Sequence, residues 1–192
     1  MACISYYHNC SKEYVCSLSP EVHEDVIWAL SHLLPRQTQA EINRDLWWLL
    51  TAKGWCYDAV PPHSTAQAPA ELPIPGTRRD EVAQRNDRSL CNTTTTIAAN
   101  WRADFARLTQ GKLVQIEVQF GKVESMFKDF CGFAIAWHEK RLSLGVEVVM
   151  HEPARHFPTR KRTISGMAYF EVARKTLPAI GLTCPIWLVG IT

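Results

Sequence analysis

A tight turn between two β-prone runs constrains the fold of this chain more than any other feature. Residues 100–120 read NWRADFARLTQGKLVQIEVQF, and the polar tetrad 109–112 with its glycine lies between the two runs. A short polar segment of this kind between two such runs predicts a β-hairpin. Successive residues of a strand point to opposite sides, so the second run has two distinct faces. One face carries Val114, Ile116, Val118 and Phe120, and the other carries Gln115, Glu117 and Gln119.

The same turn sets which residues lie opposite each other. If Gln110 and Gly111 form the turn, pairing runs outward from Thr109 and Lys112 and brings Asp104 opposite Glu117. Directly opposed residues have Cβ atoms about 5 Å apart. Two carboxylates at that distance repel each other, whereas a divalent cation between them converts the pair into a binding site. An ordinary solvated polar face is the alternative interpretation.

Composition narrows the class of protein. The 192 residues are enough for one domain with a substantial core, and 46% hydrophobic with 21% charged residues is typical of globular proteins. A formal net charge of +2 does not by itself indicate nucleic-acid binding. No apolar run reaches the roughly 18 residues of a membrane span, and no signal-peptide pattern opens the chain. We therefore expect no membrane association and a cytoplasmic location.

Seven cysteines without CxxC pairs favour free thiols in a reducing compartment over a disulfide framework. The group formed by Cys3, His8, Cys10 and Cys16 contains zinc-ligand residue types, but its spacings match no standard zinc pattern. A structural zinc site is therefore not our expectation.

Two amphipathic helices are predicted in the first third of the chain. Ser19, Pro20 and Glu21 have the residue types of an N-cap, a first helical position and an early acid, and this helix stops near Pro35. A capping box at residues 38–41 opens the second helix, which ends near residue 54.

Some segments of this first half give weaker signals. Residues 1–18 show no clear periodicity, and residues 59–76 form a proline-rich loop. Adjacent Trp47 and Trp48 cannot both face one core, so we expect one of them to pack against a neighbouring element or a partner subunit. A short charged helix is expected at 78–88.

A strand, a helix and a strand follow in order after the hairpin. The helix spans about Lys122 to Lys140 and the next strand spans Leu142 to Met150, which predicts a right-handed crossover between parallel strands. A helix from about Ser165 to Leu177 and a buried strand from Ile186 to Ile191 complete the pattern. The predicted fold class is α/β, with a mixed sheet of five strands or fewer flanked by helices, two N-terminal helices packed on it and the carboxylates near one edge.

A cluster of basic residues follows the strand that ends at Met150. Its members are Arg155, His156, Arg160, Lys161 and Arg162. Arginine and lysine at this density suit phosphate contacts, and arginine also forks onto guanine edges. A solvated surface loop is the alternative. The loop leaves the C-terminal end of a strand parallel to the one that bears Glu117, so we expect it beside the carboxylate pair.

These residues together resemble the PD-(D/E)xK nucleases. The resemblance rests on Asp104, on Glu117-Val118-Gln119 in the next strand, and on Phe120-Gly121-Lys122 at the entry to a helix. More narrowly, the run 116–122 resembles the branch of type II restriction endonucleases around BglII, BstYI and BamHI, in which glutamine or glutamate replaces the lysine of the wider superfamily. The resemblance extends over roughly residues 20–191.

The resemblance implies a function and roles for individual residues. Asp104, Glu117 and the backbone carbonyl of Val118 would bind Mg²⁺, and Gln119 would orient the attacking water. Glu81 is a further acid outside the direct metal ligands. Lys122 joins the basic loop as a contact to double-stranded DNA. The implied enzyme is a restriction endonuclease of a restriction-modification system that acts as a homodimer, and the nearest resemblance implies a palindrome centred on GATC.

The whole chain is expected to be one endonuclease domain. Residues 1–56 would form a helical N-terminal part, 57–97 a loop-rich linker and 98–192 the catalytic α/β core. Two other functions fit the same sequence. One is a structure-selective or repair nuclease built on the same core, and the other is a DNA-binding protein without catalysis, for which Gln119 in the lysine position is the argument.

Overall fold

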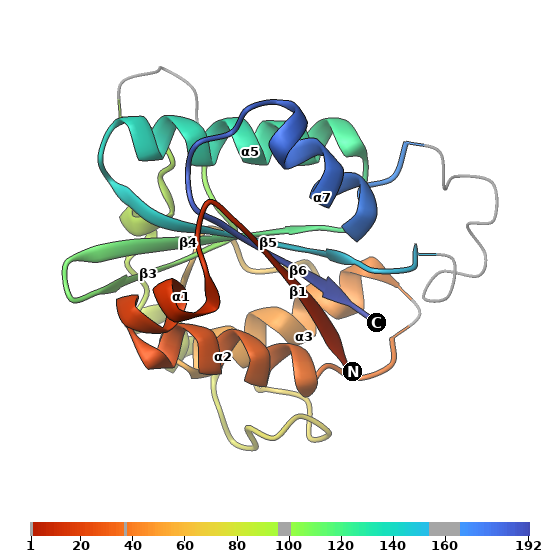
Figure 1. The fold of residues 1–192 in the computed structure, drawn as a ribbon. Helices are drawn as coiled ribbons and strands as arrows, with labels where there is room; N and C mark the ends of the chain where they lie inside the picture. The colour runs from red at the N-terminus through yellow and green to blue at the C-terminus, as the bar shows by residue number, and fades with distance from the viewer. Residues whose placement is uncertain (1, 37, 96–100, 154–165) are drawn as a thin grey trace.

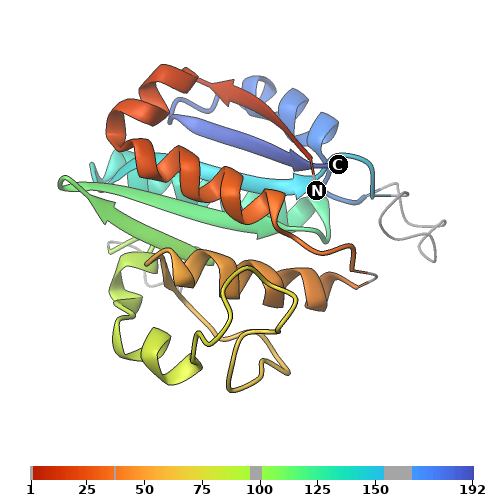
Figure 2. The same ribbon diagram turned by 90° about the horizontal axis from the view of Figure 1, so that it is seen from below.

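A mixed six-stranded sheet runs through the middle of the molecule, with helices on both faces (Figures 1 and 2). The computed structural model describes residues 2–36, 38–95, 101–153 and 166–192. The strands lie in the order β1-β6-β5-β4-β3-β2. Their bounds are β1 Cys3–His8, β2 Cys56–Tyr57, β3 Phe105–Thr109, β4 Lys112–Gln119, β5 Leu142–Met150 and β6 Ile186–Ile191.

The helices form one layer on each face of the sheet. Helices α1, α2 and α3 pack on one face, and α5 and α7 cover the other (Figure 1). The helical elements are α1 Lys12–Leu18, α2 Pro20–Ser31, α3 Gln39–Ala52, α4 Arg79–Gln84, the 3₁₀ helix η1 Arg88–Cys91, α5 Val123–His138 and α7 Phe170–Ala179. The predicted α/β class is thus confirmed. Among the described residues, no helix combines the length and apolarity needed to cross a membrane.

The predicted hairpin is present with the expected register. Gln110 and Gly111 have φ angles of 49° and 75°, the left-handed pair that a two-residue type I′ turn requires. Thr109 pairs with Lys112 and Phe105 pairs with Ile116. Strand β4 then pairs in parallel with β5, and α5 connects the two strands as predicted. The hairpin lies next to the two-residue edge strand β2, which agrees with the expected position near an edge.

The alternation along β4 separates its side chains as expected. Val114, Ile116 and Phe120 belong to the core shared with α2 and α3. On the opposite face, Gln115 is fully buried and donates hydrogen bonds to the carbonyl oxygens of Leu90 and Asn92, at 2.9 and 3.0 Å. The polar residues of β4 therefore face the layer that contains α5.

The N-terminal residues differ from the prediction. Residues 3–8 form the edge strand β1, and residues 12–18 form α1 with Ser11 as its N-cap, so the sheet has six strands instead of five or fewer. Strand β1 is paired with β6, far away in the sequence, and is only partly buried. A half-exposed edge strand shows little hydrophobic periodicity, which explains why the sequence pattern missed it. The division into three parts remains a prediction, although β1 belongs to the same sheet as the C-terminal strands.

Three further details can be compared with the sequence pattern. The capping box between Thr38 and Glu41 is confirmed. Trp47 and Trp48 are both fully buried in one core cluster and pack edge-to-face at 4.7 Å, so the expectation that they cannot both face one core is wrong, whereas the expected packing against a neighbouring element is found for Trp47. Helix α3 is enclosed on two sides, because Trp47 also packs against Tyr57 of β2 at 5.2 Å. Helix α7 begins at Phe170, later than the predicted residue 165, which lies outside the described residues.

Alanine substitutions at two glycines in or beside α5, Gly132 and Gly145, are expected to have opposite effects on stability. A Cβ on Gly145 of β5 would lie 2.8 Å from the ring of the buried Phe133, whereas a Cβ on Gly132 of α5 would meet Thr93 at an ordinary 3.5 Å. We expect Gly145→Ala to lower the free energy of unfolding by about 1–3 kcal/mol, as overpacking does. Gly132→Ala should raise it by about 0.5–1 kcal/mol through helix propensity. Urea unfolding of both variants tests this, and equal effects would contradict the packing described here.

Candidate active site

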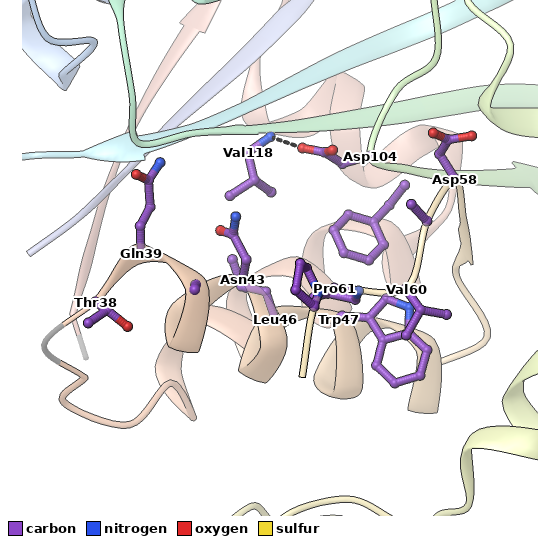
Figure 3. A pocket seen from close by; sticks show the side chains of 14 residues that line it. Thr38, Gln39, Asn43, Leu46, Trp47, Asp58, Val60, Pro61, Asp104 and Val118 are labelled. Carbon is purple, nitrogen blue, oxygen red and sulfur yellow. Dashed lines mark hydrogen bonds between the residues drawn. The ribbon is translucent and has the colours of Figure 1, made fainter. Parts of the chain in front are cut away.

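Where β3 ends, the carboxylate of Asp104 accepts a hydrogen bond from β4 that a strand carbonyl would otherwise accept. Pairing between β3 and β4 stops at Phe105 and Ile116, so Val118 has no partner strand on that side. The Val118 N–H instead donates a 2.8 Å hydrogen bond to Oδ2 of Asp104 (Figure 3). The N–H and C=O of one strand residue point toward the same neighbour. The Val118 carbonyl oxygen therefore also points to the side of Asp104.

Glu117 lies beside Asp104, as the hairpin register predicted. Burial is the main cause that raises the pKa of Glu117 well above its usual range, and the negative charges of Asp104 and Asp129 raise it further. The positive charge of Lys128 and an amide hydrogen bond from Asp104 act in the opposite direction. Two negative charges at this pair repel each other and lower the stability of the folded chain. A bound cation would offset that repulsion.

Asp104 itself is open to solvent on one side only. The residue is exposed at the wall of a pocket, while protein surrounds its carboxylate on the other sides. Burial raises the pKa of Asp104 to about 6, the Val118 N–H lowers it, and the charges of Asp129 and Asp58 raise it. Because the residue is exposed at the pocket, its desolvation is incomplete, so Asp104 ionises more readily than a fully enclosed carboxylate.

Two further acids that sequence reasoning missed lie on the α5 face of this pair. Glu147 of β5 is the register partner of Glu117, and Asp129 comes from the buried side of α5. Glu147 is fully buried, and neither of its carboxylate oxygens has a hydrogen-bond partner among the described residues. Burial, followed by the charges of Asp129, Glu117 and Asp104, raises the pKa of Glu147 well above its usual range. A charged residue within the largely apolar run 142–150 is the sequence signal that could have indicated Glu147.

Gln119 is held by hydrogen bonds at both ends of its side-chain amide. Its Nε2 donates to Oδ2 of Asp129 at 3.1 Å, and its Oε1 accepts from the backbone N–H of Gly121 at 2.9 Å. The side chain therefore folds back along the end of β4 toward the start of α5. Three residues predicted for the site, Asp104, Glu117 and Gln119, thus lie together at the C-terminal end of β4.

A pocket of about 610 Å³ opens beside Asp104 and Val118, between α3 and the segment 58–62. The amides of Gln39 and Asn43 point from α3 toward the strand that carries Val118 (Figure 3). Oδ1 of Asn43 is buried and has no hydrogen-bond partner in the described part of the chain. Sequence reasoning did not single out Asn43. The available signal was a pair of amides, at 39 and 43, continuing the apolar stripe of a helix.

Lys122 and Glu81 are the remaining predicted residues that the structure describes. Lys122 is exposed at the N-cap of α5, and Glu81 is exposed on α4. The acid that adds negative charge near Asp104 from the preceding loop is Asp58, so the role of Glu81 stays a prediction. The basic residues Arg155, His156, Arg160, Lys161 and Arg162 lie outside the described residues.

Two members of the N-terminal cysteine and histidine group, His8 and Cys10, hydrogen-bond to backbone carbonyl oxygens. His8 is hydrogen-bonded to the carbonyl oxygen of Leu182, and Cys10 to that of Ile186. Over residues 2–36, 38–95, 101–153 and 166–192, no three His, Cys, Asp or Glu side chains are grouped closely enough to hold a metal.

The donors at the end of β4 fit a hard divalent cation. Two neighbouring carboxylates, of which Asp104 raises the pKa of Glu117, and a backbone carbonyl on the same side are the oxygen ligands that Mg²⁺ takes, with water completing its coordination. Mg²⁺ usually retains several waters and uses one or two carboxylates. The pair therefore suffices without a third acidic side chain.

A mixed sheet with carboxylates at the end of a hairpin, followed by a crossover helix, is the arrangement of a restriction-endonuclease-like fold. The chain belongs to the restriction endonuclease BglII/BglIII family, whose sequence profile matches residues 5–191. Members of this family are type II site-specific deoxyribonucleases, and this chain is accordingly a site-specific DNA endonuclease.

The structure is similar to the crystal structure of restriction endonuclease BglII complexed with a DNA 16-mer. The TM-score is 0.61 at 15% sequence identity, over 100% of this chain and 76% of that chain. At this identity the similarity establishes the fold. A comparison with curated protein sequences finds no match.

Glu147 predicts a pH dependence of stability. Its pKa is raised in the folded protein, so the unfolded chain loses this proton first as the pH rises through the ordinary value of 4.5. The folded state is therefore progressively destabilised above that pH, until the folded group also ionises. We expect Glu147→Gln to match the wild type at pH 4 and to be more stable at pH 8.

Urea unfolding in EDTA between pH 4 and pH 8 measures this difference. Glu24→Gln, which changes an exposed glutamate on α2, is the surface control. If the free energies of unfolding of the wild type and Glu147→Gln change in the same way with pH, the buried carboxylate does not destabilise the folded protein at high pH.

Proposed function

We propose that the protein cleaves both strands of DNA at a short palindrome, with Mg²⁺ as cofactor and as a homodimer. The observation that carries this proposal is the Asp104–Glu117 pair at the end of β4, with the Val118 backbone turned toward it. Two like charges in this position destabilise the fold unless a cation is bound between them. Membership of a restriction endonuclease family supports the same chemistry.

Mg²⁺ would be held by Asp104, Glu117 and the Val118 carbonyl oxygen. When bound, it supplies positive charge that polarises the scissile phosphate and makes a neighbouring water more acidic. The chain's contribution is to hold the two carboxylates in a fixed geometry, through the 2.8 Å bond from the Val118 N–H to Asp104. The pocket beside Asp104 gives the phosphate and water access from the α3 side.

Gln119 would orient the attacking water. A neutral amide donates and accepts hydrogen bonds but takes up no proton at ordinary pH, so its contribution is geometric. Asn43 offers a second amide, in the wall of the pocket beside Asp104, with Oδ1 unpartnered among the described residues. These two amides would position water and phosphate oxygens around the metal without adding charge.

Contacts to double-stranded DNA would come from Lys122 and from the basic segment at 155–162. The described residues on either side of that segment support this proposal. Strand β5 ends at Met150, at the same end of the sheet as Gln119, and Gly166 accepts a 2.9 Å hydrogen bond from the N–H of Val123. Two copies related by a two-fold axis would present two such sites, one for each strand of a palindrome.

Incubation with phage DNA and Mg²⁺, followed by gel electrophoresis, tests the proposal. Discrete bands that EDTA abolishes support a site-specific endonuclease. A smear indicates a nuclease without site preference, cleavage confined to branched oligonucleotides indicates a structure-selective nuclease, and intact DNA that is nevertheless shifted on a native gel indicates a binding protein.

Removal of either carboxylate of the pair should abolish cleavage. We expect Asp104→Ala and Glu117→Ala to lose activity, with DNA affinity within about tenfold of wild type, because phosphate contacts dominate affinity. Glu24→Ala, at an exposed position on α2, is the control and should cut normally. Near-normal cleavage by Asp104→Ala or Glu117→Ala would remove that residue from the site.

Arg160 and Arg162 test the basic segment. If they contact phosphate, Arg160→Ala and Arg162→Ala should weaken binding and reduce the slope of affinity against salt by about one. If either contacts a base edge, the variant should relax cleavage at one position, at a cost of about 1–3 kcal/mol. Unchanged affinity, salt slope and site preference in both variants would leave the segment without a role in binding.

A further inference from the structure

We propose that Asp129 is a positioning residue: it holds the Gln119 side chain in the one orientation that serves the reaction. This inference rests on the proposed function of Gln119 and adds a residue that neither the sequence pattern nor the family match assigns. It follows from hydrogen bonds, burial and the close packing at Gly121.

The two partners of Gln119 define the orientation of its amide. The Gly121 N–H can only donate, so the amide oxygen faces it, and the Asp129 carboxylate accepts, so the amide nitrogen faces that group. A flip of the amide would place donor against donor at Gly121 and acceptor against acceptor at Asp129. The amide keeps one N–H and one lone pair beyond these two bonds, in directions that the two partners fix.

Asp129 lies where an apolar residue would be expected. Met126, Asp129, Phe130 and Phe133 form one buried stripe of α5, and Asp129 is only 6% exposed. Burial of a carboxylate on such a stripe is costly unless hydrogen bonds compensate. Within the described chain, the side-chain partner of Asp129 is Gln119. The carboxylate thus replaces a core side chain and fixes the end of β4.

Gly121 completes the arrangement. A Cβ at this position would lie 2.9 Å from Oε1 of Gln119, too close for that oxygen to keep its bond to the Gly121 N–H. The Gly121 carbonyl oxygen accepts a 2.9 Å hydrogen bond from the N–H of Ala168, which anchors the glycine from the other side. The Gln119 side chain is therefore gripped between a fixed backbone N–H and a fixed carboxylate.

The consequence concerns the rate of cleavage more than the binding of DNA. A free glutamine side chain samples several rotamers, and each misdirected one costs reactive geometry. Asp129 restricts that sampling before substrate arrives. If it acts through Gln119, its removal should have no effect where Gln119 is already absent.

A double-mutant cycle tests this by single-turnover cleavage of a cognate duplex at saturating Mg²⁺. We expect Asp129→Ala to slow cleavage about tenfold or more, with the dissociation constant for DNA nearly unchanged. Asp129→Asn keeps an acceptor for Nε2 and should stay within about threefold of wild type. In a Gln119→Ala background, Asp129→Ala should change the rate less than about twofold. The proposal would be overturned if the rate losses of Asp129→Ala and Gln119→Ala multiply in the double variant. It would also be overturned if Asp129→Asn loses as much rate as Asp129→Ala.

Gly121→Ala provides an independent variant that leaves Asp129 intact. It should slow the wild type as Asp129→Ala does, and should have little effect when combined with Gln119→Ala. Asp80→Ala, at an exposed position on α4, is the matched control and should cut normally. If Gly121→Ala slows cleavage further in the Gln119→Ala background, the glycine affects the rate independently of the Gln119 side chain.

A measurement without cleavage separates this inference from the proposed function. The side-chain amide of Gln119 gives a pair of NMR signals, identified by their loss in Gln119→Ala. In the wild type these signals should show slow hydrogen exchange, and Asp129→Ala should make exchange fast. Unchanged exchange would refute the positioning role even in an active enzyme. Slowed exchange in a protein that does not cut DNA would refute the nuclease function and leave the contact established.

Discussion

Strand β4 is hydrogen-bonded to β3 on one side and to β5 on the other, and these two pairings decide where each polar side chain of the site points. The antiparallel register with β3 brings Asp104 next to Glu117, and the parallel register with β5 brings Glu147 next to the same residue. A shift of one residue in either ladder would exchange the faces of β4 and bury Glu117 against α2 and α3. The apolar residues at 114, 116 and 120 prevent that shift because they fill the core on that side.

The acids gathered around Glu117 oppose the stability of the sheet that carries them. Glu117 and Glu147 repel each other and are desolvated, and Asp104 and Asp129 add two further negative charges. The surrounding core compensates for this cost, since β5 and β6 are buried along almost their whole length. The acids at the end of β4 thus lower the stability of the fold at the place where a cation and a phosphate are proposed to bind.

The sequence alone predicted the parts of the molecule that depend on local rules. The turn at Gln110 and Gly111, the capping box at Thr38 and the bounds of β5 follow from turn chemistry, capping and apolar runs. Local rules could not find β1, because the strand it pairs with, β6, lies at the other end of the sequence. They also could not find Asp129, because its role depends on where α5 packs. The carboxylate pair was accessible from sequence because both residues belong to one hairpin, whereas the acids around it come from other elements.

The order of strands across the sheet has a consequence for biosynthesis. Strand β1 is synthesised before the other strands, but its partner in the sheet is β6, which ends at Ile191. At typical rates of translation, roughly ten to forty seconds pass between the synthesis of the two strands. During that time β1 has no strand partner and one edge of β5 is unpaired, so the sheet beside β4 is incomplete. A nascent chain of this topology cannot complete its sheet until β6 has been synthesised, so the acids at the end of β4 acquire their final surroundings only at that stage.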